Sequence, residues 1–358
     1  MNIRIGVVGI GSMGARHARM LASGKVHGAT LAAVCDPSEK KLAPFSEKKF
    51  HRYEDLLASG TVDAVLIATP HYSHTTIGIA ALEAGLHVLV EKPISAHKSD
   101  CEKLLSAHTN KRQVFAAMFK MRADSRWLKI RDLVHSGALG KVRRIYWTAT
   151  HWFRPDDYYR SSGGWRGTWA GEGGGVLLNQ CPHQLDLWQW IFGMPAEVWA
   201  DCSFGKYHPI EVEDEATAYM RYANGTTGVF IASTGEFPGT NRLEIAAENG
   251  RLVYESGKWK VESGKLGALA EGGNSNFQFS TFNFQLSESS TQQHLATLQN
   301  FVDSIRDGTP LITPASEGLH SVELANAMVL STYLGDWVRL PMSATQYATL
   351  LEELVISH

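Results

Sequence analysis

The chain has 358 residues, and at roughly 100–200 residues per domain this length predicts two domains. Its 34 basic and 36 acidic residues give a net charge of −2. This balance argues against nucleic acid or anionic membrane as partners, because proteins that bind them carry an excess of Lys and Arg. Hydrophobic residues make up 44% of the sequence, enough to bury a large core and to exclude global disorder.

Cysteine and apolar patterns exclude several protein classes. The four cysteines show no CxxC spacing, so we expect neither a disulfide scaffold nor a metal site. Apolar runs fall short of the roughly 18–20 residues that span a bilayer. The chain opens on a buried-strand pattern rather than a signal peptide, which predicts a cytoplasmic protein.

The first 120 residues alternate short β-branched runs with helical patterns, as in a parallel sheet with crossover helices. We expect a doubly wound domain over residues 1–122. Its strands are predicted at 3–8, 30–35, 64–68, 87–90 and 114–117, and its helices near 12–23, 38–48, 73–84 and 97–109.

From about residue 142 the pattern changes to alternating strands separated by turns such as Asn224-Gly225. The second domain, residues 123–358, is therefore predicted to be α+β with a mostly antiparallel sheet, and its final helices are free to pack back on the first domain. Its strands are expected at 142–150, 216–221, 227–231, 250–255 and 259–262, a helix from about 181, a long loop at 264–290, and helices at 293–307 and 316–335.

Residues 9–14 form a G-x-G-x-x-G motif directly after the first strand and at the start of a helix. In this context the first glycine permits a tight turn, the second lets a pyrophosphate approach the backbone, and the third allows close helix packing. An ordinary glycine turn is the weaker alternative. The motif predicts a dinucleotide held at the helix N-terminus by Gly9, Gly11, Ser12, Met13 and Gly14.

Asp36 ends the second strand 22 residues after Gly14, near the spacing expected of an acid that holds the adenosine ribose diol. A carboxylate there repels a 2′-phosphate, so NAD is favoured over NADP, although Lys40 and Lys41 lie nearby. Capping of the next helix by Asp36 is the alternative, and the two roles are compatible.

Two further loops follow strand ends, where doubly wound sheets bind ligands. Residues 68–71 read Ala-Thr-Pro-His, and residues 91–93 read Glu-Lys-Pro. Lys92 lies between an acid and a proline at the carboxyl edge of the predicted sheet, which makes it a candidate functional residue.

Glycine and tryptophan gather in one segment, since residues 163–175 hold seven glycines and residues 147–190 hold six of the ten tryptophans. This segment leads to Asn179. Pro182 suits a first helical turn, which places His183 and Asp186 at i and i+3 on one helix face. Capping or core packing is the alternative for the histidine, and metal binding is weakly supported because no second His or Cys stands at ligand spacing.

Together these motifs resemble the Gfo/Idh/MocA oxidoreductase family over nearly the whole chain. The resemblance implies a Rossmann domain followed by a domain with a large open sheet that is often used for oligomerisation, so we expect a homodimer or homotetramer. It rests on the glycine motif, Ala-Thr-Pro at 68–70 with His74, Glu91-Lys92-Pro93, Trp165-Arg166, and the segment from Gly173 to His183.

The resemblance also implies individual roles. Lys92 would bind the reacting hydroxyl and the nicotinamide ribose, His183 would be the general acid/base, and Asp186 would hold a neighbouring hydroxyl. Trp165 and Arg166 would lie near the nicotinamide, and the active site is expected where the two domains meet. The cofactor would further be lined by Thr69, Pro70, His74 and Glu91.

Two positions depart from the family pattern. Asn179 stands where many members have Asp, and His71 replaces a frequent Asn. Asparagine orients a sugar hydroxyl, but it does not stabilise a protonated imidazole by charge.

Aromatic residues suit a carbohydrate site, because sugar C–H faces pack on rings. Arg154 and Arg160 offer an alternative, the recognition of a phosphate or carboxylate. At least one of Trp188 and Trp190 is expected to be core. The aromatic candidates are Trp147, Trp152, Phe153, Tyr158 and Tyr159, and the predicted substrate-binding set is Asn179, Asp186, Trp152, Tyr158 and Arg166.

The resulting hypothesis is NAD-dependent oxidation of a secondary hydroxyl on a sugar, glycoside or inositol, with Lys92 and His183 as catalytic residues. One alternative is an enzyme that retains NAD and cleaves glycosides through transient oxidation at C3. Another is a cofactor-sensing protein with a degraded active site. Net NADH formation distinguishes the dehydrogenase, which accumulates NADH, from the glycoside-cleaving enzyme, which does not.

Overall fold

The structure is a computed structural model that describes residues 2–255, 257–263 and 289–358. Its internal contacts divide the chain into two compact units. Unit 1 comprises Met1–Ala123, Gly171–Gly173 and Glu288–Val322, and unit 2 comprises Asp124–Ala170, Gly174–Ser287 and Glu323–His358. The contacts divide the chain at 123/124, and the late segment Glu288–Val322 belongs to unit 1.

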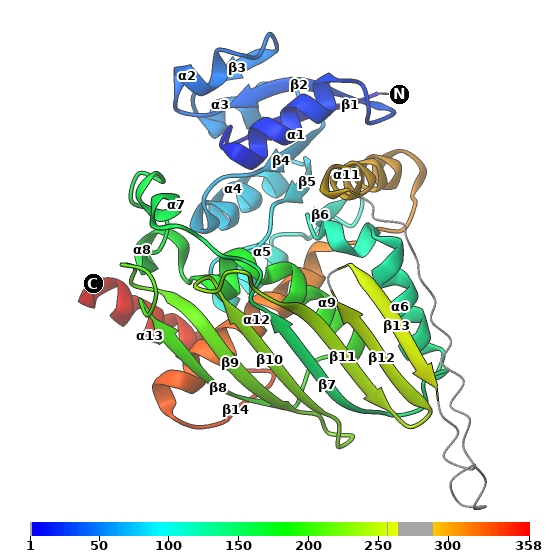
Figure 1. Ribbon diagram of the computed structural model, residues 1–358. Helices are drawn as coiled ribbons and strands as arrows, with labels where there is room; N and C mark the ends of the chain where they lie inside the picture. Colours follow the sequence, from blue (N-terminus) through cyan, green and yellow to red (C-terminus); the bar gives the residue numbers. More distant parts are fainter. Residues whose placement is uncertain (1, 256, 264–288) are drawn as a thin grey trace, which may run out of the picture. The chain divides into compact units, whose positions relative to one another are not determined.

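Unit 1 contains a six-stranded parallel sheet of order β3-β2-β1-β4-β5-β6 (Figure 1). The order reverses between β1 and β4, which creates the switch point where doubly wound sheets bind ligands at their carboxyl ends. The predicted doubly wound class is confirmed. The strands are β1 (Ile3–Val8), β2 (Ala29–Cys35), β3 (Lys48–Phe50), β4 (Ala64–Ile67), β5 (His87–Val90) and β6 (Phe115–Ala117).

The helices of unit 1 follow the predicted pattern with two differences: a short helix over Tyr53–Ala58 was not predicted, and one predicted helix is shorter than expected. The helix expected at 38–48 ends at Leu42, because Pro44 disfavours helical geometry at Ala43 and has no N–H to donate. Strand β3 then occupies part of the expected helix. The helices are α1 (Ser12–Ala22), α2 (Glu39–Leu42), α3 (Tyr53–Ala58), α4 (His71–Glu83), α5 (Lys98–Ser106), the 3₁₀ helix η1 (Lys120–Ala123) and α11 (Ser290–Asp307).

Helix α11 belongs to the core of unit 1 although it lies far along the chain. Its Leu298, Phe301 and Val302 are buried in one cluster with Ile5 of β1 and Leu21 of α1. A late helix thus packs on the first sheet, and its N-terminal turn supplies residues to the cofactor side described below.

Unit 2 contains an eight-stranded sheet of order β13-β12-β11-β7-β10-β9-β8-β14. Only the β7–β10 pair is parallel, so the expectation of a mostly antiparallel sheet is confirmed. The strands are β7 (Val142–Ala149), β8 (Glu197–Phe204), β9 (Glu213–Arg221), β10 (Thr227–Ser233), β11 (Asn241–Ala247), β12 (Gly250–Glu255), β13 (Lys258–Ser263) and β14 (Val338–Arg339).

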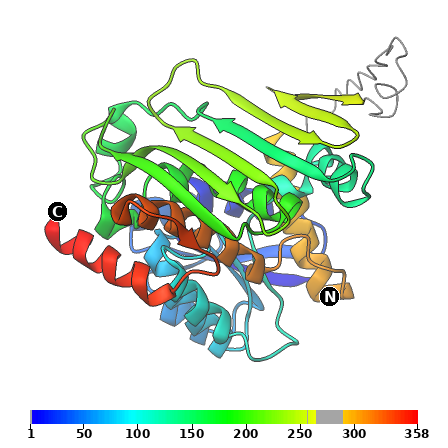
Figure 2. The same ribbon diagram turned by 90° about the horizontal axis from the view of Figure 1, so that it is seen from below.

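The remaining helices belong to unit 2 or are divided between the units, as α8 and α12 are. Figure 2 shows α13 and the C-terminal part of α12 on the same side of the large sheet. The helices are α6 (Ser125–His135), α7 (Asp156–Arg160), α8 (Trp169–Glu172), the π-helix η2 (Val176–Gln180), α9 (Pro182–Phe192), α12 (Ala315–Leu334) and α13 (Ala344–Ser357).

Tryptophans form the centre of the unit 2 core. The ring centroid of Trp147 lies 5.2 Å from that of Trp127 and 6.5 Å from that of Trp188, and all three side chains are fully buried. Helix α9 packs directly on β10, since a Cβ at Gly228 would approach Trp188 to 2.5 Å. The core role expected for at least one of the two helix tryptophans is confirmed by Trp188. Placing Trp147 at a sugar pocket was wrong, because its inward position on β7 buries it.

Two further expectations concern the whole chain. The four cysteines are free and buried. Among the described residues, no helix combines the length and apolar character needed to cross a membrane. The loop predicted at 264–290 lies almost entirely outside the described residues.

Candidate functional site

The glycine motif after β1 forms a tight loop whose three glycines have different surroundings. Gly9 has φ +87°, and a Cβ there would lie 2.7 Å from the carbonyl oxygen of Ala68. A Cβ at Gly14 would lie only 1.7 Å from the carbonyl oxygen of Gly9, whereas a Cβ at Gly11 would meet nothing within 4 Å. Gly11 is also the N-cap of α1 and supplies no side-chain cap to the helix. The loop therefore leaves open space at a helix N-terminus, which fits a pyrophosphate.

Asp36 connects this loop to the next helix. Its buried carboxylate accepts hydrogen bonds from Ile10 N at 2.8 Å, Ser38 N at 2.9 Å and Lys41 Nζ at 3.2 Å. Asp36 thus holds both the glycine loop and Ser38, but it is not the cap of α2, whose N-cap residue is Ser38 and which has no side-chain cap hydrogen bond. Binding of the adenosine ribose by Asp36 stays a prediction.

His74 joins the loops that follow β4 and β5. Its Nδ1 and Nε2 lie 2.8 Å from the carbonyl oxygens of Pro93 and Thr69, respectively. Burial lowers the pKa of His74, and the hydrogen bonds to the two carbonyl oxygens act in the opposite direction. The residue therefore sets the spacing of two loops at the carboxyl edge of the sheet.

Glu91 is held by histidines that the sequence analysis missed. Its Oε1 lies 2.6 Å from Nε2 of His17 on α1, and its Oε2 accepts from Lys92 N at 3.1 Å. Burial raises the pKa of Glu91, but the hydrogen bond and charge of His17, together with the charges of His294 and Lys92, lower it to about 2. The sequence feature that could have identified His17 is its position three residues after Gly14, on the inward face of α1.

These three side chains are also the one group of metal-ligand type found in the described part of the chain. Ligand atoms of His17, Glu91 and His294 lie within 4.8 Å of one another, and all three residues are buried. The short His17–Glu91 hydrogen bond gives the group a structural role, because it fixes the carboxylate that precedes Lys92.

Lys120, in η1 just after β6, adds a second lysine to this edge of the sheet. Its Nζ lies 2.5 Å from Ser290 Oγ at the start of α11. Burial, with repulsion from Arg16 and Lys92, lowers the pKa of Lys120 to about 8. Lys120 comes near Glu91 only because β6 lies next to β5 in the sheet. The sequence alone therefore did not identify it as a site residue.

In unit 2, Gly174 and Gly175 lead into the π-helix η2, which carries Asn179. Glu213 of β9 lies beneath its start, and its Oε1 accepts from Gly175 N at 2.8 Å and Leu177 N at 3.0 Å. Glu213 is fully buried, and burial raises its pKa to about 7. A Cβ at Gly175 would lie 2.0 Å from the carbonyl oxygen of Glu213, so this close approach requires glycine.

The helix α9 begins at Pro182 as predicted, with His183 and Asp186 one turn apart. His183 is 8% exposed and Asp186 is 1% exposed, and Asp186 Oδ1 accepts from Gln189 Nε2 at 3.4 Å. The π-helix and α9 together present Asn179 and these two side chains from one continuous segment. Local departures from α-helical geometry of this kind are frequent at functional sites.

Four of the predicted aromatic and arginine residues gather around Tyr158 of α7. The guanidinium carbon of Arg166 lies 4.3 Å from the Tyr158 ring centroid and 4.9 Å from that of Trp165. The Tyr158 hydroxyl accepts from Asn179 Nδ2 at 3.3 Å. Unit 2 thus brings together Trp165, Arg166, Tyr158 and Asn179, and Trp152 joins them through Arg154.

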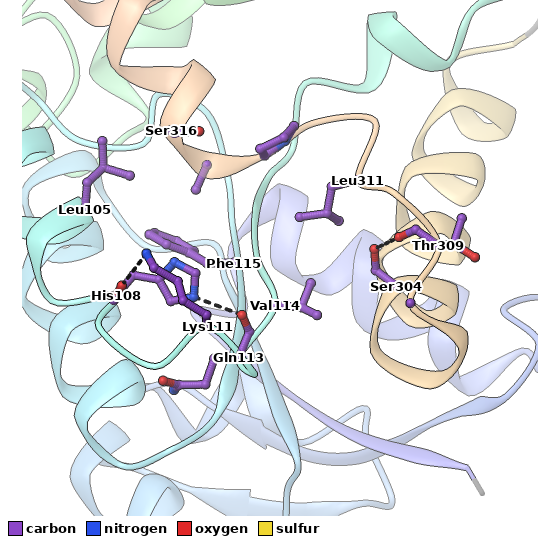
Figure 3. A pocket seen from close by; sticks show the side chains of 13 residues that line it. Leu105, His108, Lys111, Gln113, Val114, Phe115, Ser304, Thr309, Leu311 and Ser316 are labelled. Atoms are coloured by element: carbon purple, nitrogen blue, oxygen red, sulfur yellow. Dashed lines mark hydrogen bonds between the residues drawn. The ribbon is translucent and has the colours of Figure 1, made fainter.

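A pocket in unit 1 lies away from all of these residues. Figure 3 shows that His108 and Lys111 line it, and Val114 and Phe115 place it at the amino end of β6. His108 Nε2 lies 2.9 Å from Gln113 O, and Lys111 Nζ donates to His108 O at 3.2 Å. The cofactor-binding loops follow the carboxyl ends of the strands, so this pocket is not the predicted cofactor site.

Comparison with known families agrees with this arrangement. Residues 3–119 match the model of an oxidoreductase family with an NAD-binding Rossmann fold. Residues 127–253 match the Gfo/Idh/MocA C-terminal domain.

Individual relatives extend over most of the chain. The myo-inositol 2-dehydrogenase of Thermotoga maritima is 26% identical over 339 residues, which cover 91% of this chain and 95% of that protein. The WlbA dehydrogenase of Bordetella pertussis, solved with NADH and UDP-GlcNAcA, is 24% identical with a TM-score of 0.81 and covers 96% of this chain and 100% of that one.

A levoglucosan dehydrogenase solved with NADH is 20% identical, with a TM-score of 0.81, and covers 96% of this chain and 100% of that one. These two structures show the shared fold, and the family models span both halves of the sequence. The chain belongs to the Gfo/Idh/MocA family of NAD-binding oxidoreductases.

Proposed function

We propose that this protein is an NAD-dependent dehydrogenase that oxidises a secondary hydroxyl of a sugar, glycoside or inositol. The observation that carries the proposal is the presence, in a chain of this oxidoreductase family, of Lys92 directly after β5 and His183 in the first turn of α9. A cofactor-sensing protein with a degraded site would not need both residues.

The names of the relatives support the substrate class. The Thermotoga maritima relative is a myo-inositol 2-dehydrogenase, and one structural neighbour is a levoglucosan dehydrogenase. Inositol and levoglucosan are both cyclic polyols with secondary hydroxyls. No observation specifically favours the glycoside-cleaving alternative.

The cofactor is assigned mainly to unit 1. NAD, when bound, supplies the acceptor for the hydride. The open space at Gly11 suits its pyrophosphate, and the acid at Asp36 favours NAD over NADP. The proposed contacts are Gly9, Gly11, Ser12, Met13, Gly14, Asp36, Thr69, Pro70, His74, Glu91 and Lys92, with Trp165 and Arg166 from unit 2.

In the proposed reaction, His183 removes the proton of the hydroxyl, and Lys92 stabilises the negative charge that develops on its oxygen. Positioned proton transfer contributes about 10²–10⁴-fold in rate, and a fixed cation stabilises the alkoxide-like transition state. Asn179 and Asp186 orient neighbouring hydroxyls, while Trp152 and Tyr158 offer rings to the sugar C–H faces.

A substrate panel tests the proposal. The enzyme is mixed with NAD and each of a set of inositols, aldoses and glycosides, while NADH is followed by absorbance and products by mass. We expect NADH to accumulate together with a keto product two hydrogens lighter than its substrate. Release of an aglycone without NADH would instead support the NAD-retaining alternative, and NAD binding without turnover of any compound would contradict both.

We also propose a cytoplasmic homodimer or homotetramer. The large sheet leaves Trp199 of β8 39% exposed, on the face opposite the buried Val198 and Ala200. An exposed aromatic on a broad open sheet suits a subunit contact. Light scattering coupled to size-exclusion chromatography checks the oligomeric state, and a monomer at micromolar concentration would contradict it.

A further inference from the structure

Two arginines of unit 2 pack on the ring of Tyr158. The guanidinium carbons of Arg154 and Arg166 lie 5.0 and 4.3 Å from its centroid. Each also lies near a tryptophan, since Arg154 is 5.6 Å from the ring of Trp152 and Arg166 is 4.9 Å from that of Trp165. Contacts between guanidinium planes and aromatic rings orient the arginine and leave its N–H edge available to a ligand.

Among the described residues, no carboxylate pairs with either of these two arginines, whereas other arginines of unit 2 have such partners. Within the described residues, the Arg154 side chain donates one hydrogen bond, from Nη1 to Phe153 O at 3.1 Å, and the Arg166 side chain donates none. The Nε atoms of both are buried without a hydrogen-bond partner. By contrast, Arg126 and Arg242 pair with carboxylates at 2.5 and 2.9 Å.

Without a bound ligand, this arrangement of the two arginines is unfavourable in free energy. A buried N–H group without an acceptor carries an unmatched desolvation penalty, and two cations on one ring repel each other. Guanidinium groups only donate hydrogen bonds, so the ligand that satisfies them must bring acceptor oxygens. An oxyanion brings both the acceptors and the opposite charge.

The arginine pair is also joined to the segment that is proposed to hold the substrate. The Tyr158 hydroxyl accepts from Asn179 Nδ2 at 3.3 Å and from Gln180 Nε2 at 3.5 Å. Both amides belong to η2, which directly precedes the turn that carries His183. Because the hydroxyl accepts from both amides, its own proton is left to donate to a ligand oxygen.

We propose that Arg154 and Arg166 form an oxyanion subsite, and that the sugar substrate carries a carboxylate or a phosphate group that binds there. The inference rests on the proposed function, because it specifies the substrate class of the same site. Planar guanidiniums match either oxyanion with two parallel hydrogen bonds, and such charge-assisted bonds are about twice as strong as neutral ones. A neutral polyol would leave both positive charges uncompensated.

Isothermal titration of the NADH-saturated enzyme tests the subsite with three probes: D-glucose, D-glucuronate and D-glucose 6-phosphate. We expect at least one of the two anions to bind about 10-fold or more tightly than glucose. Arg154→Gln and Arg166→Gln should each weaken anion binding by about 10- to 100-fold, the range for a charge-assisted hydrogen bond. Arg154→Gln should leave glucose binding within about 3-fold, because Arg154 is not among the proposed NAD or sugar contacts. Which anion binds decides between carboxylate and phosphate.

Arg131→Gln is the matched control, because Arg131 also stacks on a tryptophan, 4.7 Å from the ring of Trp190, and lies outside this cluster. It should change anion binding by less than about 2-fold. Arg154→Lys keeps the positive charge but not the paired N–H donors of the guanidinium, so it should recover only part of the affinity for the anion. Melting curves of each variant verify that it is folded.

Equal binding of glucose and both anions, failure of both anions to bind, or anion binding that survives both glutamine substitutions would overturn the subsite. NADH formation, measured separately, distinguishes the two proposals. Arginine-dependent anion binding without turnover of any sugar would contradict the proposed function alone. Turnover of neutral sugars without dependence on either arginine would contradict the subsite alone.

Discussion

At the scale of single residues, two buried glutamates with oppositely shifted pKa values support the segments that carry the candidate site residues. Burial raises the pKa of Glu213 to about 7, although the backbone N–H groups of Gly175 and Leu177 that donate to its Oε1 act in the opposite direction. Burial acts on Glu91 too, but the hydrogen bond and charge of His17 outweigh it and lower that pKa to about 2. One carboxyl group orders the segment leading to His183, and the other orders the loop that carries Lys92.

The raised pKa of Glu213 predicts a pH-dependent stability. Between its ordinary value of 4.5 and about 7, the folded state holds a proton that the unfolded state has lost. Stability therefore falls as pH rises through this window, by up to about 1.4 kcal/mol per pH unit. Glu213→Gln keeps an acceptor oxygen and removes the titration, so the variant should be more stable than the wild type near pH 8 and equal to it near pH 4.5. Parallel stability–pH curves from urea unfolding would contradict this.

The buried His17–Glu91 pair predicts a large cost for losing one partner. His17→Ala leaves the Glu91 carboxylate buried without its closest partner, which should lower the free energy of unfolding by about 3–5 kcal/mol at neutral pH. His51→Ala is the control, because His51 forms an exposed pair with Glu39 and should cost less than about 1 kcal/mol. Chemical denaturation measures both, and equal losses would show that Glu91 does not depend on His17.

At the scale of elements, the loop between β1 and α1 separates glycines needed by the fold from a glycine suited to the cofactor. Gly9 and Gly14 have no room for a Cβ, because backbone oxygens lie 2.7 and 1.7 Å from its place. A Cβ at Gly11 would enter open space. Substitutions at Gly11 and Gly14 should therefore have different consequences.

Gly11→Ala should fold with a melting temperature lowered by no more than a few degrees, since Gly11 has φ −76° and any residue adopts that value. Its dissociation constant for NAD should rise at least about 10-fold, because the new methyl group occupies the space that suits the pyrophosphate. Gly14→Ala should instead lose stability. Calorimetry and NAD titration measure both variants, and unchanged NAD affinity in Gly11→Ala would place the cofactor elsewhere.

At the scale of the whole molecule, residues whose role depends on local pattern were predictable. The strand before Gly9 covers its expected residues, and the helix at Pro182 begins where it was expected, because periodicity and turn residues are encoded locally. Strand β8 was missed because small residues such as Ala200 and Cys202 give it weak hydrophobic alternation.

Residues that act through tertiary contacts were not predictable in the same way. Glu213 lies 38 positions from Gly175 along the chain, and Glu91 lies 74 positions from His17. The sequence around each glutamate does not indicate which residue it contacts. The candidate catalytic residues were found because a family resemblance gave them a role, whereas their supporting residues required the structure.

The central proposal is that Lys92 and His183 act in the same hydride transfer. It is tested most directly by the rate of NADH formation at saturating NAD, on the best substrate of the panel, for the wild type, Lys92→Ala and His183→Ala. We predict that each substitution lowers kcat by about 10²–10⁴-fold, and that His183→Ala keeps the wild-type affinity for NAD. Turnover of His183→Ala at the wild-type rate would contradict the assignment.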